Sequence, residues 1–141
     1  MKKRLVLKEL KKIERKYGMI TPQQVVDVAK VLNNPLHNYF DWNDTEAAKK
    51  WRIWQARYLL TTIKVELLGQ ETDAYWNAKV MIDDVSVQGY FSSERVLNDD
   101  QLYLKVLEEG LREIRYWKEK YKQIKELHEL INEDKLESLT K

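Results

Sequence analysis

The chain has 141 residues, and 25 Lys and Arg against 23 Asp and Glu leave a net charge of only +2. It contains no cysteine, which excludes a disulfide framework and thiolate chemistry and fits a reducing compartment. No apolar run approaches the roughly 18 residues of a membrane-spanning helix, and no apolar segment follows the basic N-terminus as in a secretion signal. The length predicts a single domain, residues 1–141.

The charge is divided into blocks along the chain. Residues 1–20 carry a net +6 and residues 49–64 a net +5, whereas residues 21–48 carry −3 and residues 65–101 carry −6. Opposite blocks attract one another within a molecule or between molecules. The blocks therefore predict internal pairing or a charged partner.

Residues 3–17 are predicted to form the first helix. Its apolar positions recur at intervals of four and three, and Gly18 follows as glycine does after a helix C-terminus. We interpret the basic residues on its other faces as solvated surface whose lysine stems cover apolar area. The alternative is a phosphate-binding face. Its candidate contacts are Lys8, Lys11, Lys12 and Arg15.

Thr21-Pro22 predicts the start of a second helix, and Pro35 predicts its end. The aromatic segment 35–42 is expected to form a short turn pinned into the core. His37 has no second histidine or cysteine nearby, so we interpret it as a structural residue. An enzyme built from His37 with the carboxylates of Asp41 or Asp44 is the least favoured hypothesis.

A third helix is predicted to begin with Asn43 as N-cap and Glu46 reaching back to it, and to extend to about residue 63. Trp51, Trp54 and Tyr58 share the period of a helical face, which predicts burial in the core. Aromatic residues interleaved with bases also suit single-stranded nucleic acid, which is the alternative. The basic candidates here are Lys49, Lys50, Arg52 and Arg57.

Residues 75–88 alternate with a period of two around Asp83-Asp84, which predicts one β-hairpin. Two strands are marginal alone, so the hairpin must pack on helices or extend a partner's sheet. Residues 89–96 are expected to form a loop or a short third strand. We assign Asp83-Asp84 to a turn and Asp99-Asp100 to a helix cap rather than to a metal site.

Residues 98–132 are predicted to form one long helix of roughly 50 Å, with a frayed tail at 133–141. Its apolar residues are spaced alternately by four and three, as in a heptad seam that faces a partner helix. Gly110 and His128 are imperfect members of this seam. The partner is expected to be the first helix, within one chain or across a dimer. The seam consists of Tyr103, Leu107, Ile114, Trp117, Tyr121, Ile124 and Ile131.

Residues 17–63 contain short motifs in a fixed order: Gly-x-Ile-Thr-Pro, Pro-Leu-His, an aromatic–acid–Trp step, Ala-Ala and Gln-Ala-Arg. In this sequence they are Gly18, Ile20, Thr21, Pro22, Pro35, Leu36, His37, Phe40, Trp42, Asp44, Ala47, Ala48, Gln55, Ala56 and Arg57. The stretch resembles a family of small phage and prophage proteins. The resemblance implies a phage or prophage origin and a cytoplasmic setting, and it transfers no catalytic residue.

Together these patterns predict a mostly α, α+β fold: a helical bundle with one hairpin and a long C-terminal helix packed on the N-terminal helix. No phosphate loop, nucleophile elbow, zinc pattern or dinucleotide fingerprint occurs. We therefore expect a non-enzymatic phage accessory protein that self-associates as a homo-oligomer, with a protein partner from host or phage as a further option. Nucleic-acid binding and a small carboxylate enzyme are the alternatives, and no cofactor, metal or membrane partner is expected.

Overall fold

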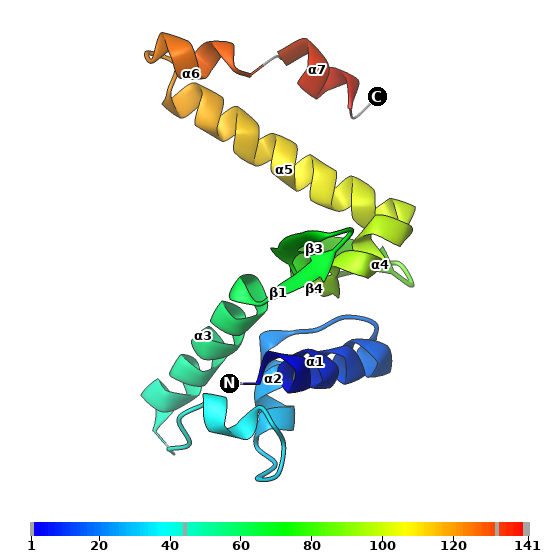
Figure 1. Ribbon diagram of the computed structural model, residues 1–141, viewed down its shortest axis with the longest axis vertical. Coiled ribbons are helices and arrows are strands. Elements are labelled where there is room, and N and C mark those ends of the chain that lie inside the picture. The colour runs from blue at the N-terminus through cyan, green and yellow to red at the C-terminus, as the bar shows by residue number, and fades with distance from the viewer. Residues whose placement is uncertain (1, 44, 132, 140–141) are drawn as a thin grey trace.

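The computed structural model describes residues 2–43, 45–131 and 133–139, and it has an α+β fold in which helices predominate (Figure 1). The N-terminal part contains α1 (Lys3–Tyr17), α2 (Pro22–Ala29), the 3-10 helix η1 (His37–Tyr39) and α3 (Glu46–Thr62). Four strands follow: β1 (Lys64–Leu67), β2 (Gln70–Asp73), β3 (Tyr75–Ile82) and β4 (Val85–Ser92). The C-terminal part contains α4 (Ser93–Asn98), α5 (Asp100–Lys120), α6 (Lys125–Glu129) and α7 (Glu133–Ser138).

The end of α1 and the start of α2 follow the local sequence signals, whereas α2 ends at Ala29, earlier than the end predicted at Pro35. Gly18 adopts φ 78° after α1 and donates its N–H to the Glu14 carbonyl at 2.7 Å. Thr21 caps α2: its Oγ1 accepts the Gln24 N–H, and its own N–H is accepted by Gln24 Oε1 at 2.9 Å. The predicted end of α1 and start of α2 are confirmed, because each depends on groups only three or four residues apart.

The start of α3 differs from the prediction. Thr45, not Asn43, is the N-cap, and its Oγ1 accepts the Ala48 N–H at 3.1 Å. Asn43 Oδ1 instead accepts the Thr45 N–H at 3.0 Å. Both residue types cap helices, and here the Asn43 side chain is used in a local turn two residues earlier.

Two antiparallel hairpins are present among the described residues, so the prediction of a single hairpin is wrong. β1 pairs with β2 around Leu68-Gly69, which we had not assigned to a turn between strands. The predicted hairpin is β3–β4, paired from Tyr75↔Ser92 to Ile82↔Val85, with Asp83 and Asp84 at φ 50° and 65° in its turn. β4 continues to Ser92, so the first part of residues 89–96, expected to form a loop or a short third strand, extends the hairpin, and α4 follows directly.

The β3–β4 hairpin is buried on both faces near its base. Neighbouring side chains in a strand point to opposite faces, and Tyr90 and Phe91 enter different cores. Tyr75 and Tyr90 belong to the larger core, with α1, α2 and α3. Phe91 is fully buried in the smaller core, whose other members are Ala78, Val80, Val96 and Leu102. Figure 1 shows the hairpin between α1 on one side and α5 on the other.

One edge of β4 is closed by the chain after α1. Ile20 and Tyr90 exchange both backbone hydrogen bonds, at 2.9 and 2.7 Å. A Cβ at Gly89 would lie 2.7 Å from Met19 Sδ and 3.0 Å from the Ile20 carbonyl oxygen. Glycine at this position therefore allows the N-terminal segment to lie directly against the strand.

The continuous C-terminal helix predicted for residues 98–132 is wrong. α5 ends at Lys120, residues 121–124 form a turn, and Lys118 Nζ donates to the Ile131 carbonyl at 3.0 Å as the chain turns back. Residues 133–138 form α7 rather than a frayed tail. None of the described residues 112–131 is buried in a core. Because tertiary packing supplies most of the stability of a helix, the helix is not stabilised through this region.

The expected pairing of the C-terminal helix with the N-terminal helix is replaced by another arrangement. α5 packs against β3 and α4, whereas α1 packs against α2 and β4. Leu102 anchors the start of α5 in the smaller core with Phe91. The β3–β4 hairpin therefore packs on α5 where the first helix was expected.

Replacing Phe91 with alanine is expected to lower the free energy of unfolding by about 3–5 kcal/mol, because it leaves a cavity between the hairpin and α5. Urea denaturation followed by circular dichroism measures this loss. Val85→Ala, at an exposed position of the same strand, is the control and should change stability by less than about 0.5 kcal/mol. Similar losses for both variants would contradict the described core.

Candidate interaction surfaces

The predicted seam residues on α5 lie on one side of the helix and are largely uncovered. Tyr103 is 50% exposed, Ile114 38% and Trp117 48%, while Leu107 is partly buried. The Trp117 ring stacks on Tyr121 with 5.6 Å between centroids, and Lys120 Nζ lies 5.1 Å from the Trp117 centroid. Ile124 and Ile131 follow the break in the helix. The structure thus keeps the seam residues of α5 on one side of one helix and separates them from Ile124 and Ile131.

An apolar groove of about 390 Å³ runs beside this seam. Tyr103, Leu107 and Ile114 form its α5 wall, and Leu97 and Trp76 face them from α4 and β3. We call this the apolar groove. Nearly all side chains along it are apolar, so filling it would remove hydrophobic surface from water.

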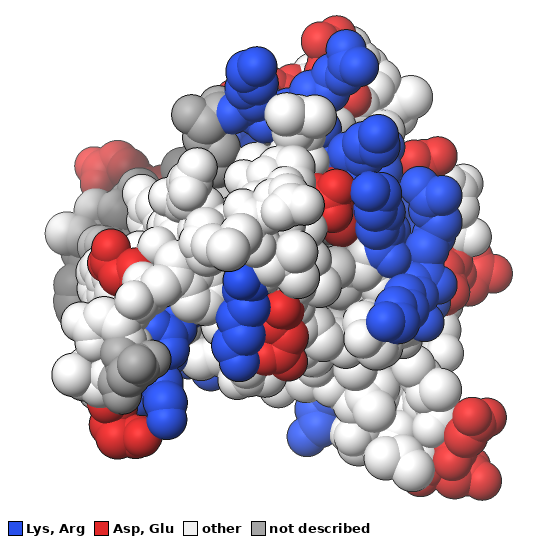
Figure 2. Space-filling model, turned by 90° about the horizontal axis from the view of Figure 1, so that it is seen from below, with Lys and Arg blue, Asp and Glu red and all other residues white. Residues whose placement is uncertain are grey.

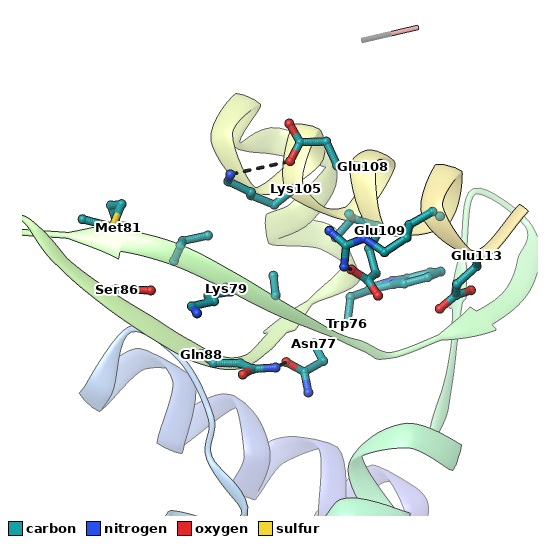
Figure 3. A pocket seen from close by; sticks show the side chains of 15 residues that line it. Trp76, Asn77, Lys79, Met81, Ser86, Gln88, Lys105, Glu108, Glu109 and Glu113 are labelled. Carbon is teal, nitrogen blue, oxygen red and sulfur yellow. Dashed lines mark hydrogen bonds and ion pairs between the residues drawn. The ribbon is translucent and has the colours of Figure 1, made fainter. Parts of the chain in front are cut away.

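A second groove, of about 720 Å³, separates α5 from β3 and is lined by charged residues of both signs (Figure 3). Arg112 binds Glu109 at 2.6 Å, and Lys105 binds Glu108 at 3.5 Å. These two pairs form along α5 itself, and the other charged residues of the groove, Lys79 and Glu113, make no ion pair among the described residues, so no charges converge on a common point. The arrangement does not indicate a catalytic centre.

His37 and Arg52 belong to a partly buried network that holds residues 37–43 against α3. His37 Nδ1 donates to the Ala29 carbonyl at 2.7 Å, and its ring stacks on Trp42 with 5.0 Å between centroids. The guanidinium of Arg52, a residue of α3, lies 5.1 Å from the centroid of the Trp42 ring. We call these contacts the Arg52 network.

Arg52, one of the possible nucleic-acid contacts of the alternative hypothesis, is therefore buried and used inside the fold. It is only 7% exposed, and its Nη1 donates to the carbonyls of Asp41 and Asn43 at 2.8 and 2.9 Å. The Asp41 carboxylate accepts the indole N–H of Trp51 at 2.8 Å. Asp44 lies outside the described residues. The groups named for a carboxylate enzyme that are described, His37 and Asp41, thus hold the chain in place.

Trp51, Trp54 and Tyr58 are not buried, so their assignment to the core is wrong. They are 45%, 50% and 51% exposed and form a ladder of stacked rings with centroid separations of 4.8 and 5.3 Å. The buried side of α3 instead consists of Ala48, Arg52, Ala56, Leu59 and Leu60. Trp54 stacks on both of its neighbours, so the faces of this central ring are covered within the aromatic ladder.

The other basic candidates are exposed. On α1, Lys8, Lys11 and Arg15 face solvent, and Lys12 also binds Glu9 at 3.0 Å. On α3, Lys49 binds Glu46 at 3.0 Å, whereas Lys50 and Arg57 make no ion pair among the described residues. Figure 2 shows Lys and Arg side chains gathered on one side of the molecule, the side toward which α1 extends in Figure 1.

The shifted pKa values do not mark a reaction centre. Burial and the neighbouring Glu14 raise the pKa of Tyr75, and burial and Tyr58 raise the pKa of Tyr39. The hydrogen bond from Lys122 lowers the pKa of Glu119 at the surface. Each cause is structural, and no cluster of three His, Asp or Glu suited to a metal ion occurs in the part of the chain that the structure describes.

Comparison with known proteins gives no relative: no family model, no curated protein and no solved structure matches the chain. The resemblance of residues 17–63 to small phage proteins therefore stays a prediction. Among the described residues, no helix is both long and apolar enough to cross a membrane.

Arg52→Ala is expected to lower the free energy of unfolding by about 2–3 kcal/mol, because it removes two hydrogen bonds from a buried charged group. Arg57→Ala, five residues along the same helix and exposed, is the matched control with an expected change within about 0.5 kcal/mol. Thermal and urea denaturation of the two variants measure the difference. Equal effects would show that the guanidinium does not hold residues 37–43 in place.

Proposed function

We propose that this protein is a non-enzymatic interaction module that self-associates through the uncovered apolar side of α5. The observation that carries the proposal is the exposure of Tyr103, Ile114 and Trp117 along α5, the first two of which line the apolar groove. Folded monomers rarely leave large contiguous apolar surfaces open to water, and such surfaces commonly mark interfaces. Trp and Tyr are also the residue types that dominate binding energy at interfaces.

A second copy of the chain is the occupant that the charges of α5 favour. Residues 99–110 contain four acids and one base, a net −3, whereas residues 111–122 contain five bases and two acids, a net +3. Two α5 helices lying antiparallel across a two-fold axis bring each acidic half opposite the basic half of its partner. A parallel pair would bring like charges together.

The setting of this module follows from the sequence resemblance. The phage-like motifs of residues 17–63 support a role as a phage or prophage accessory protein in the cytoplasm. A protein of the host or phage then engages the assembled module. No catalytic step is assigned, because His37 and Asp41 have structural partners.

The wild-type protein is expected to form a dimer at micromolar concentrations, measured by size-exclusion chromatography with light scattering. Ile114→Glu combined with Trp117→Glu places two charges on the apolar side of α5 and should yield monomers that remain folded by circular dichroism. The control, Val31→Glu with Leu32→Glu, changes two exposed apolar residues far from α5 and should remain dimeric. A wild-type monomer at every concentration would refute self-association.

Gly110 provides a test of the groove itself. It lies between the two grooves, and a Cβ there would meet nothing within 4 Å. In the monomeric Ile114→Glu, Trp117→Glu background, Gly110→Ala should stabilise α5 by about 1 kcal/mol through helix propensity. In the otherwise wild-type chain the same change should weaken the dimer, because the added methyl group occupies space that the second copy fills.

The dimer dissociation constant, measured by analytical ultracentrifugation, separates the two effects of Gly110→Ala. A higher constant together with a more stable monomer supports occupation of the groove. An unchanged or lower constant would show that the second copy does not reach Gly110.

A further inference from the structure

We infer that the outer face of α1 binds the phosphate backbone of duplex DNA without reading its sequence. This inference is independent of self-association, because α1 and α5 lie on opposite sides of the β3–β4 hairpin (Figure 1). The face is defined by the exposed basic side chains Lys2, Lys3, Arg4, Lys8, Lys11, Lys12, Arg15 and Lys16.

Of the two acids of α1, Glu14 is directed at β4, and Glu9 is nearly buried beside Lys12 at the edge of this face. Glu9 is 9% exposed and accepts hydrogen bonds from Lys12 Nζ at 3.0 Å and from Asn34 Nδ2 at 3.2 Å. Glu14 Oε2 accepts the backbone N–H of Ser92 at 2.7 Å. The outer surface of α1 therefore presents positive charge with almost no negative charge interleaved.

The bases of α1 are paired less often than those of α5. On α5 the bases Lys105 and Arg112 pair with acids three residues away, as expected where charge serves mainly solubility. On α1, Lys12 is the one base with an ion pair among the described residues.

The first turn of α1 contains no acid, although Lys3 and Arg4 stand at the positive end of the helix dipole. Cations are unfavourable at this position. An anion bound at this end of α1 would offset the repulsion between these cations and the helix dipole.

The acidic block of residues 65–101 does not neutralise the face. Within that block Asp73 binds Lys64, and no ion pair joins the block to α1 in the described parts of the chain. Figure 2 shows a cluster of Lys and Arg side chains on one side of the molecule, with single acidic side chains beside it. The internal pairing between the acidic block 65–101 and the basic block 1–20, which the sequence suggested, thus does not occur at α1 among the described residues.

The spacing on α1 suits a regular polyanion. Arg4, Lys8, Lys11 and Arg15 recur at four, three and four residues, so they form one stripe over roughly 16 Å of a rigid helix. Duplex DNA carries one negative charge per about 1.7 Å of its axis, so each of these four basic side chains has a phosphate within reach.

Two other polyanions fit less well. A membrane surface would require apolar side chains to insert, but the apolar side of α1, including Val6, Leu10 and Ile13, is buried in the core. A single strand would require free ring faces, and those of Trp54 on the aromatic ladder are covered. Duplex DNA needs neither feature.

The test uses fluorescence anisotropy of the full-length protein with a short labelled DNA duplex of arbitrary sequence. If the four stripe residues each neutralise one phosphate, affinity should fall on the order of 100-fold between about 50 mM and about 200 mM salt. The triple variant Lys8→Gln, Lys11→Gln, Arg15→Gln should bind at least about tenfold more weakly, with a salt slope shallower by about 2.7.

The matched control is Lys30→Gln, Lys79→Gln, Lys125→Gln, which removes the same charge elsewhere and should bind within about twofold of wild type if the contacts are confined to α1. Circular dichroism and light scattering must show that both variants keep the wild-type fold and assembly. Equal losses in the two variants, or no duplex binding at low salt, would overturn the inference. So would tighter binding to the matching single strand, or binding to phosphatidylserine vesicles without binding to duplex.

Discussion

The burial of the β3–β4 hairpin on both faces is the constraint on which the rest of the structure depends. Tyr90 and Phe91 are consecutive, yet each completes a different core. The alternation of a strand makes this two-sided use possible, because one peptide step reverses the side-chain direction. α1, α2 and α3 must then cover one face, and α4 with α5 the other. Two strands that would be marginal alone become the shared wall between two helical layers.

This arrangement separates two surfaces of different chemistry. The apolar side of α5 offers Tyr103, Ile114 and Trp117 to a second copy, whereas α1 offers exposed basic side chains. The hairpin lies between them, so occupation of one surface leaves the other accessible. Pairing through α5 would also place two basic α1 faces in one particle, and binding through both would raise the overall affinity for a long polyanion without any new contact.

The Arg52 network shows why residue type alone does not assign a role. Arg52 and Arg57 are five positions apart on α3, and both were candidates for nucleic-acid contact. Packing places Arg52 under the Trp42 ring with two carbonyl partners, while Arg57 stays in water. A guanidinium is suited to either position because it forms planar hydrogen bonds and stacks on aromatic rings. The loop that it holds begins near His37, which is likewise structural.

The sequence by itself determined the features that depend on neighbours a few residues away: the end of α1 at Gly18, the Thr21 cap, the Asp83-Asp84 turn and the Asp99 cap of α5. Only the tertiary structure decided which side of α3 is buried. Two stripes share the helical period, one with Trp51, Trp54 and Tyr58 and one with Ala48, Arg52 and Ala56. α3 packs against α2, and small alanines permit a close approach that indole rings prevent. The end of α5 was likewise decided by contact, because a periodic pattern cannot show where the packing surface stops.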